Sequence, residues 1–134
     1  MIRFDNVSKR YPEGHEALHD VDFHMQRGEM AFLTGHSGAG KSTLLKLIML
    51  MERPSRGHVL VADQDLAGFD REDIPYHRRR IGVVFQNHQL LFDRSVYNNV
   101  ALPLQISGYD PDDTGKRVRA ALDKVGLLHK EKLN

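Results

Sequence analysis

Residues 35–43 have the types and the spacing that could hold a polyphosphate. They read Gly-His-Ser-Gly-Ala-Gly-Lys-Ser-Thr and fit the phosphate-binding pattern G-x-x-x-x-G-K-[ST]. Such a loop surrounds phosphates with main-chain N–H groups, and side chains beyond Cβ would hold the loop away from them. Gly35, Gly38 and Gly40 therefore provide both the close approach and the unusual dihedral angles.

Two polar side chains at the end of the motif complete the predicted site. Lys41 would place an ammonium near the β- and γ-phosphates, and the Ser42 hydroxyl is placed to bind Mg²⁺. A helix that begins at about Lys41 would direct its unpaired N–H groups and its positive dipole end at the same phosphates. We expect the nucleotide to contact Gly35, His36, Ser37, Gly38, Ala39, Gly40, Lys41, Ser42 and Thr43.

An ordinary glycine-rich turn before a helix is the structural alternative to this site. A turn of that kind does not require Lys-Ser after its last glycine, so the pattern favours phosphate binding. Several charge-assisted hydrogen bonds of roughly 1.5–3 kcal/mol each make micromolar nucleotide binding plausible. The loop does not fix the reaction, because kinases, GTPases and motor-type ATPases share it.

The residues on either side of the loop predict a strand before it and a helix after it. The apolar run 30–34 is typical of a buried parallel strand. After the loop, Leu44, Leu47, Ile48 and Met51 follow the spacing i, i+3, i+4, i+7 of one helical face. The helix is expected to stop at 53–57, which contains a proline and a glycine.

The remaining predicted strands are of two kinds. Alternating apolar residues near Ile2 and Phe4 and in 21–25 predict half-buried antiparallel strands, and 59–62 predicts a further strand. The continuous apolar run 81–85 predicts a second central strand, which ends on Gln86. The chain is therefore expected to open with antiparallel strands and to continue as an α/β domain.

Two helices are expected in the last third of the chain. Ser95 is a candidate N-cap for a short helix that Pro103 would end. Asp110, followed by Pro111 at the first helical position, predicts the start of a longer helix with Val118 and Leu122 on one face. Residue 126, a glycine, is the expected stop of that helix.

Composition limits the classes of protein to which the chain can belong. Its 134 residues suffice for one domain, and a net charge of +1 gives no support for nucleic-acid binding. The absence of cysteine excludes disulfides and thiolate metal sites. The first 15 residues have no apolar signal region, and no apolar stretch approaches the roughly 20 residues of a spanning helix. A role at a membrane would therefore depend on a partner.

The histidines and one basic run are the other candidate sites. His15 and His19 lie four residues apart but lack the H-E-x-x-H context, so we expect no dedicated metal site there. The run His77-Arg78-Arg79-Arg80 has two interpretations. It is either a solvated helix end or a contact with an anionic partner or membrane surface.

Three features outside the loop decide which phosphate-loop family the chain resembles. They are Tyr11 upstream of the loop, Gln86 after an apolar run and Arg56-Gly57 at the first helix-to-strand turn. With these features, the sequence resembles the ATP-binding subunits of ABC transporters, and the likeness covers nearly the whole chain. Gly-His-Ser-Gly preceded by Phe-Leu-Thr favours members that act in cell division over relatives that export lipoproteins. The stretches that carry the likeness are 23–26, 28–41, 79–86, 96–101 and 120–128.

The resemblance implies a P-loop NTPase of the ABC type, with an antiparallel β subdomain and an incomplete parallel α/β core. It implies ATP and Mg²⁺ as cofactors, with Tyr11 stacked on adenine and Gln86 reaching Mg²⁺ and the attacking water. It also implies that 87–97 lines a groove for a cytoplasmic helix of an integral membrane partner. The complete protein would form a head-to-tail homodimer, peripheral at the inner, cytoplasmic face of the plasma membrane. Without the resemblance, an isolated tyrosine in such a loop is more often a surface-packing residue, and a glutamine after a strand is often only a cap.

Parts of the family's hydrolysis machinery do not occur within residues 1–134. These are the L-S-G-G-Q signature, an apolar strand ending in Asp-Glu and a later switch histidine. The strand at 59–62 ends in Asp63 but is followed by Gln64, so the resemblance makes it an antiparallel strand. We expect 1–134 to be the N-terminal part of one nucleotide-binding domain, able to bind ATP with little or no turnover. The alternatives are a truncated binding module and a phosphate-loop kinase that uses Asp63 and arginines near Arg78.

Overall fold

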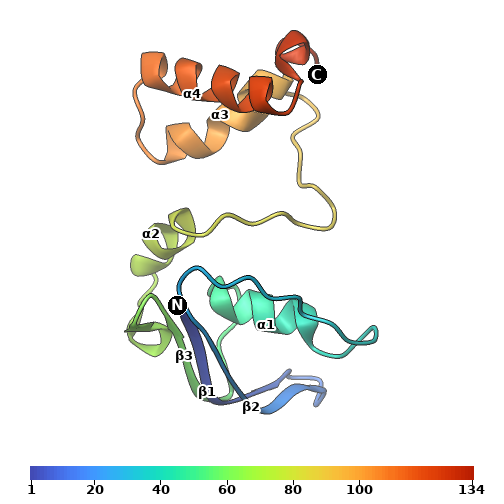
Figure 1. Ribbon diagram of the computed structural model, residues 1–134. Coiled ribbons are helices and arrows are strands. Elements are labelled where there is room, and N and C mark those ends of the chain that lie inside the picture. The colour runs from blue at the N-terminus through green and yellow to red at the C-terminus, as the bar shows by residue number, and fades with distance from the viewer. The chain divides into compact units, whose positions relative to one another are not determined.

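The computed structural model describes residues 1–134 and divides them into two compact units, Met1–Ile81 and Gly82–Asn134 (Figure 1). The first unit holds four strands, the helices α1 and α2 and a 3₁₀ turn. The second unit holds two antiparallel helices and a further 3₁₀ turn.

The sheet of the first unit is entirely antiparallel, as the alternating patterns predicted. It consists of β1 (Ile2–Arg10), β2 (Glu16–Met25), β3 (Arg56–Val61) and β4 (Gln64–Asp65) in the order β2-β1-β3-β4. Phe4 of β1 lies opposite Phe23 of β2 and Val59 of β3. The predicted strand at 59–62 is therefore confirmed, and it is antiparallel.

The helix α1 (Lys41–Ile48) packs its apolar side against this sheet and forms the core of the unit. Each large aliphatic or aromatic side chain that is fully buried stabilises the fold by roughly 1.5–3 kcal/mol. The helix ends at Ile48, before the predicted stop at 53–57, and Met49 is its C-cap. The core residues are Phe4, Val7, Leu18, Leu47, Ile48, Leu50, Val59 and Leu66.

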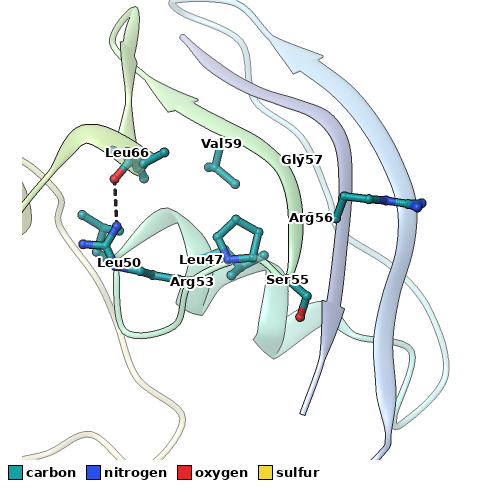
Figure 2. Close-up of a pocket in the computed structure, with 10 residues that line it drawn as sticks. Leu47, Leu50, Arg53, Ser55, Arg56, Gly57, Val59 and Leu66 are labelled. Carbon is teal, nitrogen blue, oxygen red and sulfur yellow. Dashed lines mark hydrogen bonds between the residues drawn. The ribbon is translucent and has the colours of Figure 1, made fainter. Parts of the chain in front are cut away.

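Arg53 joins the chain after α1 to the 3₁₀ turn η1 (Leu66–Gly68). Its Nη1 donates to the Leu66 carbonyl at 3.2 Å and its Nη2 to the Phe69 carbonyl at 2.5 Å. A pocket of about 280 Å³ beside this bridge has Leu47 and Val59 among its apolar lining residues, with Arg53 and Ser55 among the polar ones (Figure 2). These bonds hold the segment after β4 against the end of α1.

The helix α2 (Asp73–Arg79) contains most of the basic run. The arginines of the run are exposed, as a solvated helix end predicts, but His77 is not. His77 is buried, with 4% of its surface exposed, and its Nε2 lies 2.7 Å from the Ile48 carbonyl oxygen. Arg78 donates to the carbonyls of Met49 and Leu50. Free carbonyls at the C-terminus of α1 attract these cationic and N–H donors, which sequence spacing alone does not reveal.

The apolar runs 30–34 and 81–85 are not strands in this structure, contrary to prediction. Phe32 is 82% exposed and Val84 is 95% exposed. A strand forms only where neighbouring main-chain N–H and C=O groups are available for pairing, and no strand of the sheet pairs with either run. The parallel layer of the α/β core is therefore incomplete in this chain.

The second unit consists of the helices α3 (Val96–Ile106) and α4 (Pro111–Lys124) and the 3₁₀ turn η2 (Leu128–Lys130). Ala101, Val118 and Leu122 form its small core. Both predicted N-caps are confirmed, since Ser95 Oγ accepts from Asn98 N at 3.2 Å and Asp110 Oδ1 from Asp113 N at 2.9 Å.

Pro103 lies inside α3 and does not end it, which corrects the prediction that the helix stops there. Proline removes one main-chain donor from the helix ladder, and that loss is offset where the helix packs on a neighbour, as α3 packs on α4. At the end of α4, residue 126 is a glycine with a φ of 71°, as the stop signal predicted. No helix in the chain has the length and the apolar character needed to cross a bilayer.

Candidate nucleotide-binding site

The phosphate loop connects the irregular run 30–34 to the N-terminus of α1. Gly38 and Gly40 have φ values of 82° and 87°, in the left-handed region that favours glycine. A Cβ at position 40 would lie 2.3 Å from the Ala17 carbonyl oxygen of β2, a distance that real Cβ contacts do not reach. Gly40 therefore lets the loop lie directly against the edge of β2.

The Lys41 ammonium closes residues 35–41 into a ring. Its Nζ donates to the Gly35 carbonyl at 2.5 Å and to the His36 carbonyl at 2.8 Å. Within the loop, Ala39 N donates to the same His36 oxygen at 3.1 Å, and His36 Nδ1 lies 2.7 Å from the Ser37 carbonyl oxygen. The loop is thus held curved around its own lysine, and the ammonium can exchange these carbonyls for phosphate oxygens.

The first turn of α1 presents unpaired donors at the end of the loop. The first main-chain bond at this end runs from Leu44 N to the Gly40 oxygen at 2.9 Å, so Lys41, Ser42 and Thr43 keep free N–H groups. The Gly40 cap offers no side-chain acceptor, and the first turn has no acidic residue. An anion is the group that satisfies such an arrangement, since both the donors and the helix dipole favour negative charge.

Tyr11 lies beside the loop although it is 32 residues away in sequence. Its hydroxyl is 3.2 Å from Thr43 Oγ1, and Thr43 is buried. The exposed Ser42 hydroxyl, its neighbour, is the group in the loop that fits Mg²⁺, since Mg²⁺ prefers oxygen ligands shared with substrate phosphates. Stacking of Tyr11 on adenine and binding of Mg²⁺ by Ser42 stay predictions.

Lys9 is a residue near the site that sequence reasoning missed. Its Nζ lies 5.1 Å from the centroid of the Tyr11 ring and donates to Glu52 Oε2 at 2.8 Å and to the Arg53 carbonyl at 2.9 Å. Residues i and i+2 project to the same side of an extended chain, so the spacing of Lys9 and Tyr11 was the available signal.

Gln86 belongs to the second unit, where it lies exposed in a turn between the run 81–85 and α3. The turn is marked by a bond from His88 N to the Phe85 carbonyl at 3.2 Å and by a φ of 55° at His88. Its predicted contact with Mg²⁺ and the attacking water stays a prediction, as does its alternative role as a cap.

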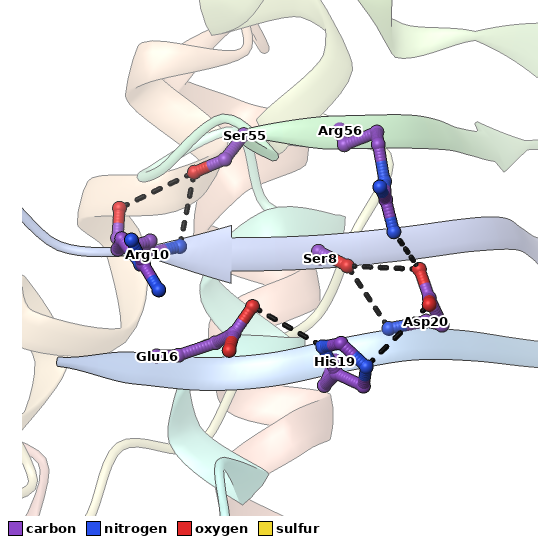
Figure 3. A network of polar contacts seen from close by, with 7 residues as sticks. All are labelled: Ser8, Arg10, Glu16, His19, Asp20, Ser55 and Arg56. Carbon is purple, nitrogen blue, oxygen red and sulfur yellow. Dashed lines mark hydrogen bonds and ion pairs between the residues drawn. The ribbon is translucent and has the colours of Figure 1, made fainter.

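The histidines do not form a metal centre in the structure, which contains no group of three or more His, Asp or Glu residues arranged for one. His19 instead lies between two carboxylates, with Nδ1 3.3 Å from Glu16 Oε1 and Nε2 3.5 Å from Asp20 Oδ2 (Figure 3). This contact belongs to the polar network of β2.

The glycine loop, its lysine and the helix behind it, combined with the antiparallel sheet, are the features of a P-loop NTPase fold of the ABC type. The family model described as ABC transporter matches residues 18–134, and the chain belongs to this family. The resemblance inferred from the sequence is thereby confirmed.

Several known proteins are similar to this chain over almost its whole length. The cell division ATP-binding protein FtsE of Escherichia coli K12 is 60% identical over 132 residues, which are 98% of this chain and 60% of the relative. FtsE of Haemophilus influenzae is 50% identical over 131 residues, with 97% and 60% covered. The dimeric ATP-binding cassette solved with bound ADP and phosphate has a TM-score of 0.88 and 29% identity, with 98% and 60% covered. The chain thus spans about 60% of the length of these relatives.

Proposed function

We propose that residues 1–134 are the N-terminal, Mg·ATP-binding part of an ABC-type ATPase subunit that acts in cell division. The ring closed by Lys41 around the loop, next to three free N–H groups of α1, is the observation that carries this proposal. Phosphate oxygens would replace the two carbonyls on the ammonium, and the Ser42 hydroxyl would hold Mg²⁺. Bound Mg²⁺ would neutralise charge on the β- and γ-phosphates.

The partner in this proposal is an integral membrane protein of the FtsX-like type. A groove of about 590 Å³ in the second unit supports it, because the groove is mostly apolar and suits the apolar face of a helix. Five of its lining residues fall within the predicted stretch 87–97, and α4 supplies others. The named groove residues are Leu90, Leu91, Phe92, Arg94, Val96, Val100, Leu122 and Val125.

Hydrolysis is proposed for a homodimer in which these residues are joined to the signature motif, an Asp-Glu strand and a switch histidine. Residues 1–134 by themselves are proposed to bind nucleotide and to turn over little, since transition-state contacts come from the groups they do not contain. Gln86 would link the nucleotide to the partner groove that follows it in sequence. Such a dimer would lie at the cytoplasmic face of the plasma membrane, held there by its partner.

A phosphate-loop kinase is the competing enzyme class, and no structural observation favours it. Asp63, its expected acceptor-binding residue, lies in the tight turn between β3 and β4 with a φ of 63°. Of the arginines near Arg78 that it would also use, Arg78 itself already binds the carbonyls after α1. ADP formation that depends on an added acceptor would support the kinase and contradict the ABC proposal.

Titration of the chain with Mg·ATP tests the proposed function. We expect Lys41→Ala to weaken binding at least tenfold, because it removes the single ammonium of the loop. Lys46→Ala is the matched control, since Lys46 is an exposed lysine of the same helix near its other end. Equal affinities for the wild-type chain and Lys41→Ala would overturn the proposal.

The partner proposal has a separate test in the groove. Val125 is exposed and lines the groove, so we expect Val125→Asp to abolish binding of a fluorescent peptide from the cytoplasmic helix of an FtsX-like protein. Met51→Asp places the same charge on an exposed apolar residue of the first unit and should leave peptide binding unchanged. Peptide binding that is insensitive to Val125→Asp would exclude this groove.

A further inference from the structure

We propose that Tyr11 is held in place for the nucleotide base before any nucleotide arrives, by the hydroxyl of Thr43 and the ammonium of Lys9. The inference rests on the proposed function and adds two positioning residues to it. It also gives Thr43 a role beyond phosphate contact. The chain would then select nucleoside triphosphates over bare polyphosphate through groups that do not touch the base.

The main chain at Tyr11 is fixed by the turn that follows β1. Tyr11 N donates to the His15 carbonyl at 2.8 Å, and Gly14 N donates to the Tyr11 carbonyl at 2.9 Å. The side chain is fixed at its far end by the 3.2 Å contact with Thr43 Oγ1. Thr43 is buried in the first turn of α1, so its hydroxyl is a stationary anchor.

One face of the Tyr11 ring is already occupied. The Lys9 side chain is only 12% exposed, and its Nζ lies 5.1 Å from the ring centroid, within the range of a cation–π contact. The ammonium also donates to Glu52 Oε2 and to the Arg53 carbonyl, which hold it in place. A base can therefore stack only on the face away from Lys9.

Ordering the ring in advance changes affinity without adding a contact. A free aromatic side chain loses rotamer freedom when a ligand immobilises it, and a ring that is already fixed avoids that loss. The effect applies to ligands that carry a base and is absent for inorganic tripolyphosphate, which contacts the loop alone. The ratio of the two affinities thus reports on the position of Tyr11.

The test is calorimetric titration of the 134-residue chain with Mg·ATP and, separately, with Mg·tripolyphosphate. Tyr11→Phe keeps the ring and removes the hydroxyl, and it should weaken ATP binding roughly fivefold, as expected for one neutral hydrogen bond. Tripolyphosphate binding should not change. Tyr76→Phe is the matched control, because Tyr76 is an exposed tyrosine beneath Arg79 with no partner for its hydroxyl.

A double-mutant cycle identifies Thr43 as the anchor. In the Thr43→Val background, Tyr11→Phe should no longer change the ratio of ATP to tripolyphosphate affinity. Thr43→Ser keeps the hydroxyl and should restore the sensitivity to Tyr11→Phe. Removing the ammonium with Lys9→Met should lower ATP affinity and leave tripolyphosphate affinity unchanged.

Two results would overturn the inference and are distinguishable from failure of the proposed function. If the wild-type chain binds both ligands but Tyr11→Phe changes neither affinity, or changes both equally, Tyr11 is not positioned by Thr43. If the wild-type chain binds neither ligand, the proposed function itself fails, and this inference fails with it.

Discussion

The imidazole Nε2 of His77 lies 2.7 Å from the main-chain oxygen of Ile48, the last residue of α1. Arg78 donates to the next two carbonyls, those of Met49 and Leu50, at 2.9 and 2.8 Å. The helix whose N-terminus faces the phosphate site thus has its C-terminal acceptors bound by α2. Hydrogen-bond donors at the C-terminus of α1 and an anion at its N-terminus both interact favourably with the helix dipole.

His77→Ala should destabilise the first unit by about 2–3 kcal/mol, because it leaves the Ile48 carbonyl unpaired and opens a cavity beside Phe69. Urea unfolding followed by circular dichroism measures the change. His24→Ala, at an exposed position of β2, should shift the midpoint far less. Equal shifts for the two variants would contradict the capping role.

Gly40→Ala should destabilise the chain by about 2 kcal/mol or more. The new Cβ meets the Ala17 carbonyl oxygen, and the left-handed backbone adds strain of its own. Gly38→Ala is matched for strain, with a φ of 82°, but its Cβ meets nothing within 4 Å. Gly40→Ala should therefore have a lower Tm than Gly38→Ala in thermal unfolding. The reverse order would mean that the loop does not lie against β2.

Asp20 should make stability depend on pH in the acid range. Its hydrogen bond with Arg56, and secondarily its contacts with Ser8 and His19, hold the pKa of the Asp20 carboxyl below its ordinary value (Figure 3). Since the folded pKa is below the unfolded one, this contribution is present above about pH 4 and is lost as the pH falls through the folded pKa.

Asp20→Asn should accordingly lower the urea midpoint at pH 7 by a small amount, as expected for an exposed ion pair. The difference from the wild-type chain should shrink as the pH falls below about 4. Asp93→Asn, at an exposed position of the second unit, is the control for the loss of one carboxylate and should leave the urea midpoint of the first unit unchanged. If the stability difference between Asp20→Asn and the wild-type chain grows on acidification, folding does not lower the pKa of Asp20.

Thr114→Val should leave the stability of the second unit unchanged or raise it by about 1 kcal/mol. The Thr114 hydroxyl is buried in α4 without a hydrogen-bond partner, and valine replaces it with a group of the same shape. Thr114→Ser keeps the unpaired hydroxyl and removes the methyl group, so it should be destabilising. If Thr114→Ser is more stable than Thr114→Val in chemical denaturation, the hydroxyl has a hydrogen-bond partner.

The local signals in the sequence predicted much of this fold. Ser95 and Asp110 are predicted N-caps, because short polar side chains at that position accept from main-chain N–H groups near the start of a helix. In the structure both accept from the N–H three residues ahead. Alternating apolar residues predicted β1 and β2, because a half-buried antiparallel strand needs no more than one apolar face. The prediction that Pro103 ends α3 is wrong, because the cost of one missing donor depends on what the helix packs against.

Sequence by itself determined the phosphate loop, since its glycines, lysine and serine act through contacts within nine residues and through the helix that begins there. Tertiary structure decided whether the apolar runs 30–34 and 81–85 became strands, because pairing requires donors and acceptors from other segments. It also decided the surroundings of Tyr11 and His77. Their partners, Thr43 and Ile48, lie about 30 residues away in sequence and meet them only when the chain folds onto α1.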